Sequence, residues 1–174
     1  MKDSRPVVAI YPGTYDPVTL GHVDIIRRAA AIFDRVVVGV VRSPTHKAPL
    51  FTVDERLQFL EDALADVANA RVEPFSELVV AFARRFDATV IVKGLRVISD
   101  FEWEFQMNHL NQTQAPEIET MYLMSRPQFS FVSSSGAKEL AAFGGNVDEL
   151  VPAGVARRFA ELYGEARAHV PSQE

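Results

Sequence analysis

Five short strand-like runs, most of them rich in apolar residues, recur along the chain, separated by stretches long enough for a helix. They cover residues 7–11, 36–41, 70–73, 89–92 and 120–124, and several consist largely of Val and Ile. Continuous apolar runs of this length are typical of parallel strands that helices cover on both faces of a sheet. The pattern predicts an α/β fold with a five-stranded parallel sheet.

The segments between these runs carry signals of helix starts. We expect helices over residues 23–33, 53–66, 77–86, 100–111 and 152–166. Capping boxes begin at Thr52 and Ser99, Ser76 is a candidate N-cap, and Pro152 suits a first helical turn. The alternation predicts a single Rossmann-like, doubly wound domain over residues 1–168, with ligands at the carboxyl ends of its strands. Residues 169–174 show no packing pattern, so we expect a frayed tail.

The composition limits the classes of function. The chain has 174 residues, no cysteine and a net charge of -5, and its mean hydropathy is +0.02. The acidic balance argues against general nucleic-acid binding, and no apolar run approaches the ~20 residues that span a bilayer. The lack of cysteine excludes disulfides, and residues 1–6 show no signal-peptide core. We therefore expect a cytoplasmic protein that binds neither nucleic acid nor membrane.

Residues 11–22, between the first run and the first helix, suggest where a ligand binds. This segment contains Gly13 and Gly21 and ends at His22, beside a helix start. The N–H groups and partial positive charge of a helix N-terminus attract phosphate, and glycine lets the backbone come close to a ligand. The arrangement predicts a phosphate near His22, although an isolated histidine there could instead hydrogen-bond its own loop.

Polar residues also follow three other runs. They are Arg42, Ser43, Thr45, His46 and Lys47 after the second run, Lys93, Gly94 and Arg96 after the fourth, and Ser130, Ser133, Ser134, Ser135 and Lys138 after the fifth. Parallel strands bring these loops, with Thr14 and Asp16, to one edge of the sheet. Cations, hydroxyls and two helix N-termini would form an anion site there, large enough for more than one phosphate. Taken singly, each segment could be a solvated turn or a helix cap.

No motif for covalent catalysis is present. The sequence lacks a G-x-S-x-G elbow, a G-x-x-x-x-G-K-[ST] loop and a G-x-G-x-x-G fingerprint after the first run, and no His and carboxylate spacing indicates a protein-held transition metal. Phosphoryl or nucleotidyl transfer suits such a site, because positioning and charge stabilisation supply most of the catalysis.

Four segments together resemble those of the bacterial phosphopantetheine adenylyltransferase family. Thr19-Leu20-Gly21-His22 is similar to the T/H-x-G-H signature of nucleotidyltransferases. That signature alone indicates only the nucleotidyltransferase superfamily. Three further segments narrow the resemblance to the one family: Lys93-Gly94-Leu95-Arg96, Asp100-Phe101-Glu102-Trp103-Glu104 and the serine-rich segment 129–135. It implies that ATP and 4′-phosphopantetheine give 3′-dephospho-coenzyme A and pyrophosphate by direct in-line attack.

The resemblance also implies roles for individual residues. His22, Lys47 and Arg96 would be catalytic. The acceptor would contact Thr14, Lys47, Val79 and Lys93. ATP would contact Thr14, Tyr15, His22, Gly94, Leu95, Arg96, Glu104, Phe129, Ser130, Phe131, Val132, Ser133, Ser134 and Ser135. Mg²⁺ would arrive on the nucleotide, the protein would be a homohexamer, and coenzyme A could bind as a feedback inhibitor.

Two positions depart from the pattern of the family. Lys93 stands where many members have arginine, which keeps the charge but loses bidentate contact. Lysine usually stands two positions after the proline that Pro44 matches, whereas here that position is His46 and Lys47 follows. Lys47 is the preferred loop cation and His46 the alternative. A sibling nucleotidyltransferase with another phosphorylated acceptor, or a non-catalytic ATP-binding module, is the alternative function.

Overall fold

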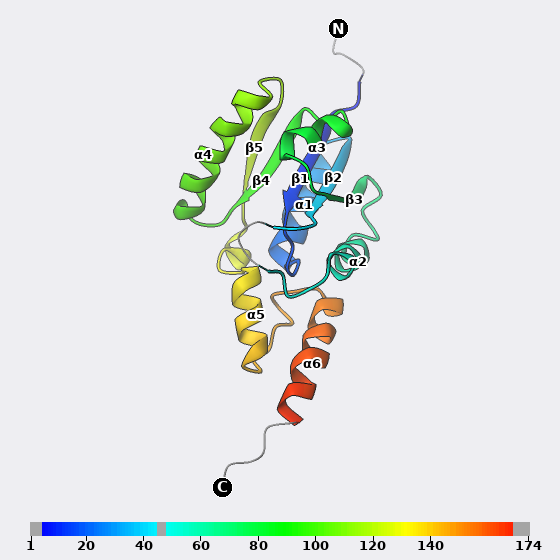
Figure 1. The fold of residues 1–174 in the computed structure, drawn as a ribbon, viewed down its shortest axis with the longest axis vertical. Coiled ribbons are helices and arrows are strands. Elements are labelled where there is room, and N and C mark those ends of the chain that lie inside the picture. The colour runs from blue at the N-terminus through cyan, green and yellow to red at the C-terminus, as the bar shows by residue number, and fades with distance from the viewer. Residues whose placement is uncertain (1–4, 45–47, 169–174) are drawn as a thin grey trace.

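The computed structural model describes residues 5–44 and 48–168 (Figure 1). Its strands are β1 (Val8–Gly13), β2 (Arg35–Val41), β3 (Ala70–Phe75), β4 (Val90–Leu95) and β5 (Glu119–Met124). All neighbouring pairs are parallel, in the order β3-β2-β1-β4-β5. The predicted α/β fold with a five-stranded parallel sheet is confirmed.

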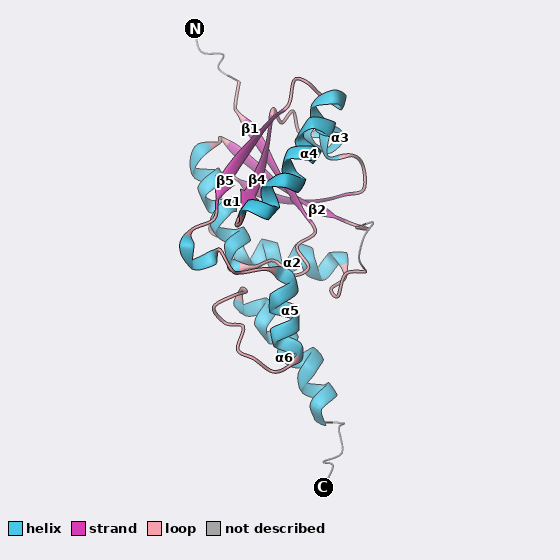
Figure 2. Ribbon diagram, turned by 90° about the vertical axis from the view of Figure 1, so that its left-hand side faces the viewer, coloured by secondary structure: helices cyan, strands magenta, loops and turns pink. Residues whose placement is uncertain are grey.

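Six helices connect or follow these strands within the described ranges. They are α1 (Leu20–Ile32), α2 (Val53–Ala63), α3 (Val79–Arg85), α4 (Ile98–Gln114), α5 (Ser134–Ala142) and α6 (Ala153–Ala168), with a short 3-10 turn, η1 (Pro127–Phe129), before α5. Figures 1 and 2 both show α5 and α6 beyond the sheet, at the end opposite the N-terminus. The described helices include none that is long and apolar enough to cross a bilayer.

The side chains of β1 alternate between two hydrophobic cores, as the pleat of a strand requires. Ala9 and Tyr11 face a core formed with α1, α2, α5 and α6, whereas Val8 and Ile10 face a core formed with α3 and the segment after α4. All four side chains are buried. Helices on both faces therefore explain why this strand is apolar at every position.

Two of the predicted N-caps are wrong. The α4 helix begins at Ile98 with Val97 at its N-cap, and no side chain caps it, so Ser99 lies inside the helix. Only two residues separate the end of β4 from α4, which leaves no room for a cap at Ser99. The α3 helix begins at Val79 after Leu78, not after Ser76; the Ser76 N–H instead bonds to a carboxylate oxygen of Glu77 at 2.9 Å.

The structure places the other three predicted helix starts, those of α2, α6 and α1, at or within three residues of the expected positions. Thr52 forms the expected capping box, because its Oγ1 accepts the Glu55 N–H at 3.2 Å while Glu55 accepts the Thr52 N–H at 2.9 Å. Pro152 lies just before α6, where its carbonyl accepts two helical N–H groups. The α1 helix begins at Leu20, three residues earlier than expected. The predicted frayed tail, residues 169–174, lies outside the described residues.

Candidate active site

The site lies where the chain order of the sheet reverses. Strand β1 has β2 on one side and β4 on the other, and ligands of doubly wound proteins bind at the carboxyl ends of strands at such a point. A hollow of about 480 Å³ opens there, which we call the polar hollow. It is lined by Tyr11, Pro12, Gly13, Tyr15, Thr19, Gly21, His22, Ile25, Lys93, Gly94, Arg96, Glu104, Ser125, Val132, Ser133, Ser134 and Ser135.

A second, mostly apolar hollow of about 620 Å³ adjoins the first, and we call it the apolar hollow. It is lined by Thr14, Tyr15, Asp16, His22, Val41, Ser43, Pro44, Pro49, Phe75, Ser76, Glu77, Leu78, Val79, Ser134, Ser135 and Lys138. The two hollows share Tyr15, His22, Ser134 and Ser135. His22 therefore lies at the boundary between a polar and an apolar binding space.

His22 is held by the start of its own helix. Thr19 is the N-cap of α1, and its N–H donates to Nδ1 of His22 at 3.0 Å, while its Oγ1 accepts the backbone N–H of His22 at 3.3 Å. This is a capping box with histidine in the place of the usual Glu or Gln. Since Nδ1 accepts a hydrogen bond, the neutral ring carries its proton on Nε2. The helix start thus leaves one N–H donor for a ligand.

The electrostatic surroundings keep this ring neutral. Burial of the ring lowers the pKa of His22 to about 4, and the positive charge of Arg96 contributes to the same shift. A neutral imidazole donates a hydrogen bond without adding a full charge to the site. A neutral ring protonated on Nε2 can donate one hydrogen bond to a ligand at neutral pH.

The ring of Tyr15 occupies the space beside Gly13, which explains why that position is a glycine. Its backbone has a positive φ of 51°, and its hydroxyl donates to the carbonyl of Tyr11 at 2.7 Å. A Cβ on Gly13 would lie 2.9 Å from the ring of Tyr15. The space that Gly13 leaves open is therefore filled by this ring rather than by a ligand. The ring also packs edge-on against His22, with centroids 5.2 Å apart.

Lys93 and Gly94 lie inside β4 rather than in the loop after it. They pair with Tyr122 and Leu123 of β5, which extends the strand to Leu95. Lys93 points into the polar hollow, where its Nζ lies 3.1 Å from a carboxylate oxygen of Glu104. Sequence reasoning assigned Lys93 to the acceptor and Glu104 to ATP, and the structure brings the two side chains into one ion pair.

The serine-rich segment is anchored from several sides. Ser133 caps α5 by accepting the Gly136 N–H at 3.0 Å, and Ser134 donates to the carbonyl of Pro17 at 2.7 Å. Arg96 donates to the carbonyl of Val132 at 3.2 Å. These contacts hold the N-terminus of α5 against the loop that follows β1, at the edge of both hollows.

Two other interactions near the site were not assigned roles from the sequence. Asp16 is buried and accepts hydrogen bonds from the N–H groups of Leu50 and Phe51 and from Nζ of Lys138, the last at 2.6 Å. Arg56 is 1% exposed and donates to main-chain carbonyls. The sequence does contain a signal for Arg56: it lies one helical turn from Val53 and from Leu60, so helical spacing places this charged residue on the apolar side of α2.

Most of the predicted site residues line one of the two hollows, and the others are distributed as follows. Leu95 is buried within the fold. Phe129, Ser130 and Phe131 line neither hollow. Lys47 and its alternative His46 lie outside the described residues. The sequence therefore identified the edge of the sheet and most of the side chains that gather there.

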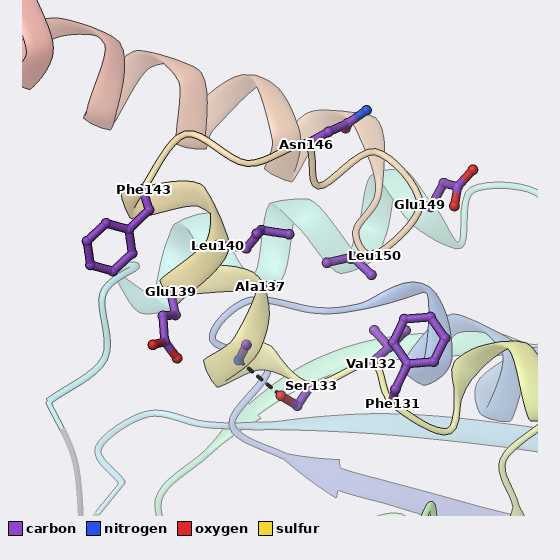
Figure 3. Close-up of a pocket in the computed structure, with 11 residues that line it drawn as sticks. Phe131, Val132, Ser133, Ala137, Glu139, Leu140, Phe143, Asn146, Glu149 and Leu150 are labelled. Atoms are coloured by element: carbon purple, nitrogen blue, oxygen red, sulfur yellow. Dashed lines mark hydrogen bonds between the residues drawn. The ribbon is translucent and has the colours of Figure 1, made fainter.

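A third hollow, of about 630 Å³, lies between α5 and the segment that leads to α6 (Figure 3). Figure 3 shows Leu140 and Leu150 pointing toward it and Phe143 turned outward. This hollow shares Val132 and Ser133 with the polar hollow, but none of its lining residues is Lys, Arg or His. It lacks the cations that a phosphate site needs.

No group of three His, Cys, Asp or Glu residues able to hold a metal ion occurs in residues 5–44 and 48–168. The two hollows together contain a neutral histidine, three basic side chains (Lys93, Arg96 and Lys138), hydroxyls and helix N-termini, with Glu104 and Asp16 paired to two of the basic groups. These groups can position phosphates and stabilise negative charge.

Comparisons with known proteins agree with this chemistry. The sequence profile of the cytidylyltransferase-like family matches residues 10–140. The phosphopantetheine adenylyltransferase of Heliobacterium modesticaldum is 49% identical over 158 residues, covering 91% of this chain and 94% of the relative. That of Gloeobacter violaceus is 53% identical over 146 residues, covering 84% and 90%.

A solved structure supports the fold independently. The nicotinic acid mononucleotide adenylyltransferase of Plasmodium falciparum, complexed with NaAD, superposes with a TM-score of 0.68 at 11% identity, over 92% of this chain and 97% of that chain. At this identity the likeness concerns the fold alone. The family profile and the curated relatives carry the assignment further: this chain belongs to the phosphopantetheine adenylyltransferase family.

Proposed function

We propose that this protein transfers the adenylyl group of ATP to 4′-phosphopantetheine, giving 3′-dephospho-coenzyme A and pyrophosphate. The observation that carries the proposal is the position of His22 between the polar and the apolar hollow. The polar hollow suits a nucleotide with its phosphates, and the apolar hollow suits the pantetheine arm, with Val79 on its wall. The relatives named phosphopantetheine adenylyltransferase support this choice of acceptor.

In this reaction a phosphate oxygen of the acceptor attacks the α-phosphorus of ATP. The bond from the α-phosphorus to the oxygen that bridges it to the β-phosphate breaks, and pyrophosphate leaves with the electron pair. The nucleophile is already an anion, so it needs no strong general base. Nε2–H of His22 donates to a non-bridging oxygen of the α-phosphate, where negative charge grows in the transition state.

The other residues position the two substrates. Arg96 and the N-terminus of α5 hold the phosphates of ATP, because both offer N–H donors to anions. Thr14 and Lys93 hold the phosphate of the acceptor. Lys47 remains the predicted loop cation, with His46 as the alternative.

Magnesium would enter bound to the phosphates of ATP. Such Mg²⁺ keeps several waters and needs few protein ligands, and its charge would offset the charge that develops on the leaving pyrophosphate. The residues of this chain then serve to orient the phosphates that carry the ion.

We further propose a homohexamer located in the cytoplasm and open to feedback binding by coenzyme A. Apolar side chains exposed on α4 and β5 support association between copies, since isolated α/β domains rarely leave a large apolar patch on the surface. They are Phe101, Phe105, Leu110, Met121 and Met124. Coenzyme A contains the same pantetheine arm as the acceptor and would compete for the apolar hollow. Sedimentation velocity and inhibition kinetics measure these two properties separately.

The activity is tested by pyrophosphate release from the purified protein. We expect release only when ATP, Mg²⁺ and 4′-phosphopantetheine are all present, with dephospho-coenzyme A appearing in equal amount. A panel with nicotinamide mononucleotide or glycerol phosphate as acceptor, and with CTP in place of ATP, examines the sibling activities. Turnover of another acceptor in preference to 4′-phosphopantetheine would overturn the proposal, and ATP binding without turnover of any acceptor would indicate a non-catalytic module.

A further inference from the structure

The most unusual buried group outside the described binding residues is the guanidinium of Arg56. Its side chain is almost completely buried, with 1% of the residue exposed. It donates four hydrogen bonds, each to a main-chain carbonyl: to Thr14 at 2.7 Å, Val41 at 2.8 Å, Arg42 at 3.1 Å and Phe51 at 3.2 Å. A guanidinium has five N–H donors in a rigid planar fork, so this geometry uses nearly all of them.

The four carbonyls belong to three segments that are far apart in the sequence. Thr14 follows β1, Val41 ends β2 with Arg42 directly after it, and Phe51 immediately precedes the cap of α2. Thr14 and Val41 line the apolar hollow, and none of the four residues lines the polar hollow. Arg56 therefore lies beneath one of the two binding spaces and not the other.

Asp16 binds the segment before α2 as well, through the N–H groups of that segment instead of its carbonyl. It accepts the Phe51 N–H at 2.8 Å and the Leu50 N–H at 3.0 Å, while Arg56 binds the carbonyl of Phe51. The loop after β1, the end of β2 and the segment before α2 are thus joined through two buried charged side chains.

Burying a charge costs free energy, and an apolar side chain would fill the same space at lower cost to folding. Unlike an apolar side chain, an arginine at this position fixes the distances between main-chain carbonyls of separate segments. We propose that Arg56 is a positioning residue for the acceptor: it fixes the backbone of Thr14 relative to the end of β2 and so sets the shape of the apolar hollow. This inference rests on the proposed function for the identity of the acceptor.

The test compares Arg56→Lys and Arg56→Met with the wild type. Lysine keeps the charge but has three donors on one nitrogen, which cannot span carbonyls from three segments; methionine removes all four bonds. We expect KM for 4′-phosphopantetheine to rise about 10- to 100-fold in both variants, because small misplacements of a binding group have effects of this size. The dissociation constant of ATP should stay within about 3-fold of the wild-type value, since none of the four residues that Arg56 binds lines the polar hollow.

Two controls separate positioning from general destabilisation. Ile118→Ala removes a buried side chain before β5, at the amino ends of the strands, and lowers stability without touching the apolar hollow. Arg158→Met removes the arginine that binds Glu55 at 2.8 Å near the start of α2, so it tests whether any loosening of this helix is enough. Both controls should leave the two substrate constants unchanged.

The proposal is supported if the acceptor constant alone rises in the Arg56 variants. It is overturned if both substrate constants change in parallel, if neither changes, or if the control variants show the same selective rise. Should Arg56→Met fail to fold, Arg56→Lys carries the test.

Amide hydrogen exchange makes the test independent of the acceptor's identity. Faster exchange confined to residues 12–16, 41–44 and 50–52 in Arg56→Lys supports positioning, and uniform acceleration overturns it. If the wild type turned over no acceptor, the proposed function would fail, and these exchange rates would still decide the role of Arg56.

Discussion

Replacing His22 by alanine removes a hydrogen-bond donor from the site and half of the capping box of α1. The first loss lowers kcat and the second lowers the stability, so the two can be measured separately. The Nε2–H donor acts where charge develops, and loss of one such donor costs about 2.7–4 kcal/mol, or about 10²- to 10³-fold in kcat. The lost cap leaves the Thr19 N–H without its 3.0 Å partner, a cost of about 1 kcal/mol. For a chain of this length that lowers Tm by roughly 2–4 °C.

A second variant distinguishes the two roles. Glutamate in place of His22 restores the usual capping box, because its carboxylate accepts the Thr19 N–H, but it places a negative charge beside the phosphates. We expect His22→Glu to keep a Tm near that of the wild type and to lose at least as much activity as His22→Ala.

Pyrophosphate release measures kcat, and thermal unfolding measures Tm. Gln58→Ala is a control, since Gln58 is exposed on α2, bonds Asp62 at 2.8 Å and lines neither hollow. If His22→Ala turned over within about 5-fold of the wild type while its Tm fell, His22 would be a cap and the catalytic reasoning would be refuted.

Three further predictions concern the charges around the site. Arg96→Ala should raise the pKa of His22 from about 4 toward its ordinary 6.5, because a positive charge is removed; an unchanged ring titration by NMR would contradict this. Burial alone would raise the pKa of Asp16, but hydrogen bonds from Lys138 and two backbone N–H groups lower it below its ordinary value. Asp16 therefore stabilises the fold above pH ~4 and loses this contribution as the pH falls through the lowered pKa, so Asp16→Asn should flatten the acid side of the Tm profile; a steeper profile would count against it. Lys93→Arg should lower KM for the acceptor by about 2- to 10-fold through bidentate contact with phosphate, and a higher KM would show that the Lys93 position suits lysine.

The sequence determined the features that depend on neighbouring residues. Apolar runs predicted the five parallel strands, and the threonine cap of α2 was correct, because strand pleating and helix capping involve residues only a few positions apart. The edge of the sheet that carries the site followed from the polar residues after successive strands. The predicted helix starts at Ser76 and Ser99 failed, because α3 begins three positions after Ser76 and α4 begins before Ser99; a local capping pattern does not show where the preceding strand ends.

Only the tertiary structure decided how the site is divided and held. Lys93 meets Glu104 across two elements, and Arg56 bonds carbonyls as far away as 42 positions in the sequence. The low pKa of His22 comes from burial and from Arg96, which is brought near by the pairing of β1 with β4. Each of these depends on distances between segments and on exclusion of water, and neither quantity exists until the sheet and its helices have packed together.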